Sequence, residues 1–164
     1  HKPDRRQRQM CIRDSIDAND AIVFRRCSYT HDPDVLRSIK QLCAINSVLQ
    51  IDLSGNANAE SVNGRIISTP GGLPDFATGA ARSEGGKSII AMRSSFKKGE
   101  VSNIVVALDA ASPTTLRNEQ IDYVVTEFGV ADLSSNDLEV RAKALIDVAH
   151  PDHRERLARE WRDR

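Results

Sequence analysis

The sequence shows no excess of either charge, because Lys plus Arg and Asp plus Glu both number 23. A chain without a net field has no general attraction to nucleic acid or to anionic membranes, and we expect neither as a partner. No apolar run approaches the length of a membrane span. Aromatic residues make up only 4% of the chain, whereas hydrophobic residues reach 40%. This composition, in 164 residues, fits one globular domain with a real core.

Cysteine is also scarce, and its spacing excludes two kinds of site. Cys11, Cys27 and Cys43 form no CxxC motif and have no histidines nearby, so neither a zinc site nor a redox pair is predicted. The four histidines lack metal-ligand spacing as well, and we expect no bound metal. An odd cysteine count without a visible signal peptide fits a reducing compartment, so we expect a cytoplasmic location.

The first segment, HKPDRRQRQMCIRD, is basic and has neither helical nor strand periodicity. A basic arm for nucleic acid is one interpretation. However, RRQRQMCIRDS resembles translated sequencing adapter, and we favour the interpretation that residues 1–14 are a non-native or disordered leader. We therefore expect the folded domain to span residues 15–164.

Apolar runs in the rest of the chain predict a series of short strands. The core runs are continuous rather than alternating, which is typical of parallel strands covered on both faces. We therefore predict an α/β domain with an open, mostly parallel sheet flanked by helices. The predicted strands span residues 48–53, 65–68, 88–92, 103–108 and 123–126.

Two helices are predicted near the C-terminus. The first carries an apolar stripe, with Asp137 as its cap and Arg141 pointing outward. The dipeptide His150-Pro151 ends this helix, and Pro151 can be the first residue of another that runs through Trp161. The stripe consists of Leu138, Ala142, Leu145 and Ala149.

Two glycine pairs flank a further predicted helix that begins at Pro74. The first pair, Gly71-Gly72, lies just before the helix, where free backbone N–H groups and the positive end of the helix dipole favour a negative oxygen. An oxyanion hole or a phosphate cradle fits this position, and a tight structural turn remains an alternative.

The second pair begins GGKS, which is part of a phosphate-binding loop motif. That motif needs another glycine five residues before Gly86, where this chain has Ala81, and it follows a strand and opens a helix. Here GGKS follows a predicted helix and opens a predicted strand. A non-catalytic phosphate- or nucleotide-binding domain stays as an alternative, which a helix after Gly86 would favour.

Glu127 lies at the end of an apolar strand and just before Gly129. Open α/β sheets place ligand-binding groups at this edge, although a solvated carboxylate in a loop is equally compatible with the sequence. The basic run RSSFKK at 93–98 is suited to phosphates or to a solvated loop.

Five blocks carry a resemblance when they are taken in order. They are INSVLQIDLSGNANAES at 45–61, GGLPDFATGA at 71–80, GGKSIIAM at 85–92, VVTEFGVADL at 124–133 and RAKALIDVAHPDHRE at 141–155. Together they resemble the C-terminal domain of the acetyl-CoA hydrolase and 4-hydroxybutyrate or butyrate:acetate CoA-transferase family. The resemblance covers the chain from about residue 21 onward.

The resemblance implies a CoA-transferase-like C-terminal domain, cut from a longer enzyme of acetate metabolism that commonly self-associates. Its partners would be acyl-CoA, a small carboxylate and the family's N-terminal domain, with coenzyme A as substrate and no covalently bound cofactor. A glutamate upstream of this chain would attack the acyl-CoA and form a glutamyl-CoA thioester. The fragment alone would be inactive, and acetyl-CoA hydrolysis is the close alternative.

The resemblance also assigns roles to individual residues. Gly72 would supply a backbone N–H to the oxyanion hole, and Gly71 would support that turn as part of the CoA site. Glu127 would be a second active-site glutamate that orients groups, not the nucleophile. Lys97 would contact CoA, with Lys98 as the alternative.

One position departs from the family. Relatives often have Asn-Asp-Pro where this chain has His31-Asp32-Pro33, so the sequence does not support a substrate contact from that asparagine. Asn58 matches the family, and either a loop-stabilising role or a substrate contact is compatible with its place in a turn.

Overall fold

The computed structural model describes residues 12–17 and 19–164. Most of the predicted leader, residues 1–14, therefore lies outside the described residues. Among the described helices, none is both long and apolar enough to cross a bilayer.

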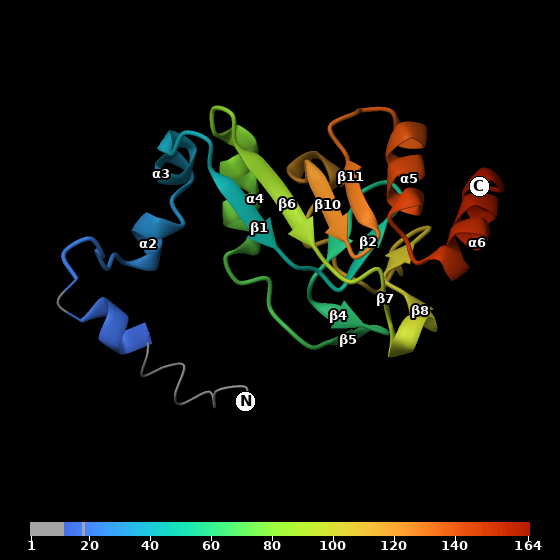
Figure 1. The fold of residues 1–164 in the computed structure, drawn as a ribbon, viewed down its shortest axis with the longest axis horizontal. Helices are drawn as coiled ribbons and strands as arrows, with labels where there is room; N and C mark the ends of the chain where they lie inside the picture. The colour runs from blue at the N-terminus through green and yellow to red at the C-terminus, as the bar shows by residue number, and fades with distance from the viewer. Residues whose placement is uncertain (1–11, 18) are drawn as a thin grey trace.

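The centre of the fold is a four-stranded sheet with the order β1-β6-β10-β11. Strand β1 (Cys43–Asn46) pairs in parallel with β6 (Lys87–Ala91), and β6 pairs in parallel with β10 (Tyr123–Thr126). The last strand, β11 (Gly129–Asp132), runs antiparallel to β10. The predicted α/β class with a mostly parallel sheet is thus confirmed (Figure 1).

Two of the predicted strands belong to a separate, smaller sheet. Strand β2 (Gln50–Asp52) pairs antiparallel with β3 (Ala57–Asn58) and parallel with β9 (Ile104–Val105). The apolar runs at 48–53 and 103–108 therefore predict strands at the correct places but overestimate their length. Two hairpins complete the β structure, β4 (Ser61–Val62) with β5 (Arg65–Ile66) and β7 (Ser95–Phe96) with β8 (Val101–Ser102).

Helix α4 (Leu73–Arg82) packs behind β1 and β6 in Figure 1 and leads directly into β6. The connection is tight: Gly85 has φ of +69°, and a Cβ on Gly86 would meet the carbonyl oxygen of Ala80. Only glycine fits such a close approach. Because a strand follows Gly86, the second glycine pair forms a structural turn, and the topology of a phosphate-binding loop is absent here.

The C-terminal part forms α5 (Leu138–Asp147) and α6 (Pro151–Arg162). Asp137 caps α5 as predicted, since its side chain accepts a hydrogen bond of 2.8 Å from the backbone N–H of Glu139. The predicted outward orientation of Arg141 is wrong. Its side chain is buried and donates to the carbonyl oxygen of Asn118 at 2.7 Å, and desolvation lowers its pKa.

Between the helical residues 12–16 and β1 lie two further short helices. Helix α2 (Cys27–Thr30) leads into α3 (Pro33–Ser38), which Asp32 caps. Leu36 of α3 lies against Gly79 of α4, so closely that a Cβ there would be 2.6 Å from the Leu36 Cβ. Two 3-10 turns, η1 (Lys97–Gly99) and η2 (Asn118–Gln120), lie between strands.

The core lies between the four-stranded sheet, α4, α5 and the smaller sheet. Its largest fully buried side chains include Leu36, Ile51, Leu53, Ile90, Ile104, Leu116, Leu133, Leu145 and Leu157. The prediction that the strands are covered on both faces is wrong for the described residues. Ile45 of β1 is 66% exposed and Val130 of β11 is 62% exposed, both on the face opposite α4.

Candidate functional site

The carboxyl edge of the parallel sheet gathers the chemically active groups. Strands β1, β6 and β10 end there, so Arg93 and Ser94 after β6 lie near Glu127 after β10. Helix α4 returns to the start of β6, and this places its N-terminus, at Gly71 and Gly72, along the same edge. Open α/β sheets bind ligands at this edge because the loops and helix N-termini meet there.

Glu127 is held by Ser94. Its Oε2 accepts from the Ser94 backbone N–H at 2.9 Å, and its Oε1 accepts from the Ser94 hydroxyl at 2.8 Å. Desolvation raises the pKa of Glu127, but the hydrogen bonds from the backbone and from Ser94, together with the charge of Arg93, outweigh it, and the pKa lies below its usual value. The side chain is therefore an oriented carboxylate at neutral pH, able to accept a proton or a hydrogen bond.

Glu127 borders a cavity of about 500 Å³. Arg93 and Lys97 line the same cavity, so two cations face a space that also contains one carboxylate. Lys97 has a left-handed backbone, with φ of +50°, within η1, and its Nζ lies 5.8 Å from the centre of the Phe96 ring. The structure thus brings together two of the predicted site residues, Glu127 and Lys97.

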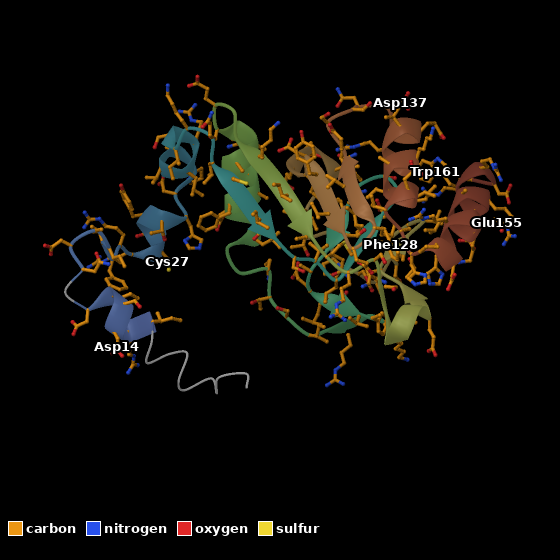
Figure 2. The ribbon with its side chains drawn as sticks, in the orientation of Figure 1. Asp14, Cys27, Phe128, Asp137, Glu155 and Trp161 are labelled. Atoms are coloured by element: carbon orange, nitrogen blue, oxygen red, sulfur yellow. The ribbon has the colours of Figure 1, made fainter. Side chains whose placement is uncertain are left out.

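The same cavity has a wall that the sequence did not reveal. Phe128 and His150 line it, with their ring centres 5.4 Å apart and nearly perpendicular, close to the start of α6 (Figure 2). His150 also caps α6, accepting from the Asp152 backbone N–H at 3.4 Å. The position of a capping histidine was predictable, but its approach to a residue 22 positions earlier depends on the tertiary fold.

The stretch from Val148, at the end of α5, to His153, in the first turn of α6, contacts both sides of this cavity. On one side, His153 Nε2 is 2.8 Å from the carbonyl oxygen of Gly99 in η1. On the other, the Thr126 hydroxyl donates to the carbonyl oxygen of Val148 at 2.6 Å and accepts from the backbone N–H of Phe128. Residues 148–153 therefore hold the Lys97 loop and the Glu127 loop together.

The first glycine pair lies outside the cavity lining but keeps free donors. Gly71 has φ of +56°, and Gly72 precedes the first residue of α4. Among the described residues, neither glycine N–H donates a hydrogen bond, so both are free to donate to a ligand oxygen. The predicted anion-binding role of this helix N-terminus stays a prediction, and neither glycine lines the Glu127 cavity.

His31 lies directly against this turn, which the sequence did not reveal. A Cβ added to Gly72 would be 2.5 Å from His31 Nε2. The ring is fixed from two other directions: Nδ1 is 2.9 Å from the Thr30 hydroxyl, and the ring meets Phe76 edge-on at 5.2 Å. The residue that departs from the family pattern is therefore the residue that covers Gly72.

Asn58 has a structural role in this arrangement. It is fully buried, and its Nδ2 donates to the carbonyl oxygen of Ser61 while its Oδ1 accepts from the backbone N–H groups of Glu60 and Ser61. These bonds hold the turn between β3 and β4, as the loop-stabilising alternative predicts. The described residues include no group of three or more His, Cys, Asp or Glu that could hold a metal ion.

The fold and the edge site define an α/β domain of the kind that binds ligands at the carboxyl end of a parallel sheet. Residues 10–161 match the family model described as the acetyl-CoA hydrolase/transferase C-terminal domain, and the chain belongs to that family. This confirms the family inferred from the five sequence blocks.

Individual relatives agree with this assignment. The 4-hydroxybutyrate coenzyme A transferase of Clostridium kluyveri is 41% identical over 92% of this chain and 35% of its own length. The solved 4-hydroxybutyrate CoA-transferase of Porphyromonas gingivalis superposes with a TM-score of 0.76 at 41% identity, over 92% of this chain and 34% of that one. RipA from Yersinia pestis superposes with a TM-score of 0.84 at 37% identity, over 92% of this chain and 34% of its own. The chain thus spans about a third of the length of the proteins it matches.

Proposed function

We propose that this chain is the C-terminal domain, at residues 15–164, of an acyl-CoA:carboxylate CoA-transferase of the acetate, butyrate or 4-hydroxybutyrate type. The observation that carries the proposal is membership of the hydrolase/transferase family together with a cavity that combines Glu127, Arg93 and Lys97. Cations suit the phosphates of CoA, and an oriented carboxylate suits the reacting centre.

The proposed reaction uses a glutamate that precedes this chain in the complete enzyme. That carboxylate attacks the thioester carbonyl, CoA thiolate leaves, and an acyl-glutamyl anhydride forms. The thiolate then attacks the glutamyl carbonyl, which releases the first carboxylate and leaves a glutamyl-CoA thioester. The second carboxylate then attacks the glutamyl-CoA thioester and displaces CoA thiolate, which gives a second anhydride. The thiolate attacks the acyl carbonyl of this anhydride, and the new acyl-CoA and the free glutamate are released.

The residues of this chain would bind and orient the reactants. The Gly72 N–H would donate to the thioester oxyanion, with Gly71 providing the left-handed turn that aims it. Glu127 would orient the nucleophile and the substrate through its fixed carboxylate, and Lys97 would contact CoA. Self-association and a cytoplasmic location belong to the same proposal.

Acetyl-CoA hydrolysis is a second candidate, since the family description includes hydrolases. In that case water would resolve the glutamyl-CoA thioester, and the outcome depends on how well the site excludes water. Label from acetate would enter acyl-CoA only if the enzyme is a transferase, so tracing labelled acetate in the full-length enzyme separates the two.

The isolated chain is expected to show no turnover, because the proposed nucleophile lies outside it. The measurement is CoA transfer from acetyl-CoA or butyryl-CoA to a carboxylate acceptor, with the Clostridium kluyveri enzyme as positive control. Robust transfer by residues 15–164 alone would show that the nucleophile lies within this chain and would overturn the proposed division of the site.

The isolated chain is still expected to bind CoA, and Lys97→Ala should weaken that binding about tenfold because a charged hydrogen bond to phosphate is lost. Isothermal titration calorimetry with free CoA measures this effect. Lys143→Ala, an exposed lysine on α5, is the matched control and should leave the affinity unchanged. Equal CoA affinities for Lys97→Ala and Lys143→Ala would show that Lys97 does not contact CoA. The nucleotide-binding alternative predicts a different result, namely magnesium-dependent binding of ATP that Lys87→Ala abolishes.

A further inference from the structure

One face of the four-stranded sheet is uncovered among the described residues. The residues on this face lie in register across the strands, so that Ile45 of β1 is beside Ile89 of β6, and Ile89 is beside Tyr123 of β10. A second row joins Ala91, Val125 and Val130. We call these six residues the open face. In Figure 1 the face points toward the viewer, with α4 behind the sheet.

The opposite face of the same strands is well covered. Its side chains, among them Ala44, Ser88, Ile90 and Val124, are buried against α4 and the core. Parallel strands are almost always covered on both faces, because the helices that connect them pack on either side. Apolar side chains as exposed as Ile45 and Val130, grouped on one surface, therefore indicate a surface that another element buries.

The edge of the open face is charged. Lys87 places its Nζ 5.4 Å from the centre of the Tyr123 ring. Asp132 pairs with Tyr123 across β10 and β11 and lies at the same end of the face. Hydrogen bonds from the Ser134 hydroxyl and backbone, with a smaller contribution from the charge of Lys87, lower the pKa of Asp132. An apolar centre with a charged rim is the usual anatomy of a buried contact between two folded elements.

We propose that the open face is the docking surface for a helical segment of the polypeptide that precedes this domain in the complete protein. The chain matches a C-terminal domain and spans only about a third of its relatives, so a long preceding polypeptide is available to cover it. A helix fits because helices, rather than a second sheet, cover the faces of parallel sheets. The inference rests on the proposed function only in assuming that this preceding polypeptide exists.

The test measures how accessible the open face is in two settings. Ile45→Cys is placed in residues 15–164 alone and in a chimera in which these residues replace the matching third of the Clostridium kluyveri enzyme. All other cysteines are changed to serine. Glu155→Cys, which points away from the sheet on the outer side of α6, is the matched control (Figure 2). Reaction with a maleimide reagent is followed by mass spectrometry.

We expect Ile45→Cys to react rapidly in the isolated chain and at least about tenfold more slowly in the chimera, while Glu155→Cys reacts equally in both. Equal reaction of Ile45→Cys in both settings would overturn the proposal. So would slow reaction in the isolated chain that speeds up on dilution, because a second copy would then occupy the face. CoA transfer by the chimera is measured separately. Protection of Ile45→Cys without CoA transfer would support the docking surface and contradict the proposed function. CoA transfer without protection would support the proposed function and contradict the docking surface.

Discussion

Replacing Glu127 with alanine in the chimera is expected to lower kcat about 100-fold, because the reacting groups lose an oriented carboxylate. Both oxygens of Glu127 are held by Ser94, so the side chain has one preferred position before substrate arrives. Steady-state CoA transfer measures the effect. Glu155→Ala, an exposed glutamate on α6, is the control and should retain full activity. A Glu127→Ala chimera with unchanged kcat would remove Glu127 from the reaction.

The pH dependence gives an independent check on the same residue. Because the pKa of Glu127 lies below the ordinary value of 4.5, the carboxylate stays ionised as the pH falls through that value, and activity that requires it is lost only at lower pH. Ser94→Ala removes the hydroxyl donor and should raise this pKa, which moves the acid limb of the rate profile to higher pH. An acid limb that does not move would show that it reports another group.

Gly72→Ala is expected to reduce the free energy of unfolding by about 1–3 kcal/mol. It is also expected to lower kcat by about 100-fold, because the backbone N–H, which alanine keeps, is displaced when the turn moves. The added methyl group would lie 2.5 Å from His31 Nε2, so either the ring or the turn has to move. The φ of Gly72 is −84°, which alanine adopts readily, and the cost therefore comes from the contact with His31 and not from the backbone. Urea denaturation of the isolated chain and kcat of the chimera provide the two measurements.

The double variant His31→Ala/Gly72→Ala distinguishes this contact from other causes. Removing the ring makes room for the methyl group, so the stability lost in Gly72→Ala should largely return. Gly71→Ala is the matched comparison: nothing lies within 4 Å of its Cβ position, and its cost arises from φ of +56° whether or not His31 is present. If the double variant is no more stable than Gly72→Ala, the proposed contact does not limit this position.

The parts of the fold that local pattern determines were predictable. Pro74 and Pro151 lie in the first turns of α4 and α6, and Asp137 caps α5, because these signals act on neighbouring backbone groups. Two of the three parallel strands, β6 and β10, end within one residue of the ends that their apolar runs predict. Strand β1 was not predicted: its apolar run, LCAI at 42–45, is only four residues long, and of Cys43–Asn46 only Ala44 is buried.

Long-range contacts explain what the sequence did not reveal. The sequence pattern places Arg141 on the polar, outward face of its helix. In the structure its guanidinium donates at 2.7 Å to the carbonyl oxygen of Asn118, which lies 23 residues earlier in η2. His31 follows the last residue of the short helix α2, and nothing near it in the sequence indicates its contact with Gly72, which is 41 positions away. The five sequence blocks identified the family because five motifs in a fixed order are far more specific than any single periodicity.

The segment between α5 and α6 has a mechanical consequence for the cavity. Val148 anchors the Glu127 loop through Thr126, and His153 anchors the Lys97 loop through Gly99, with Pro151 stiffening the bend between them. One short stretch of chain, residues 148–153, thus sets the distance between the Glu127 carboxylate and the Lys97 cation. Insertions or deletions at this bend would change the span between the two loops while leaving every residue that faces the ligand intact.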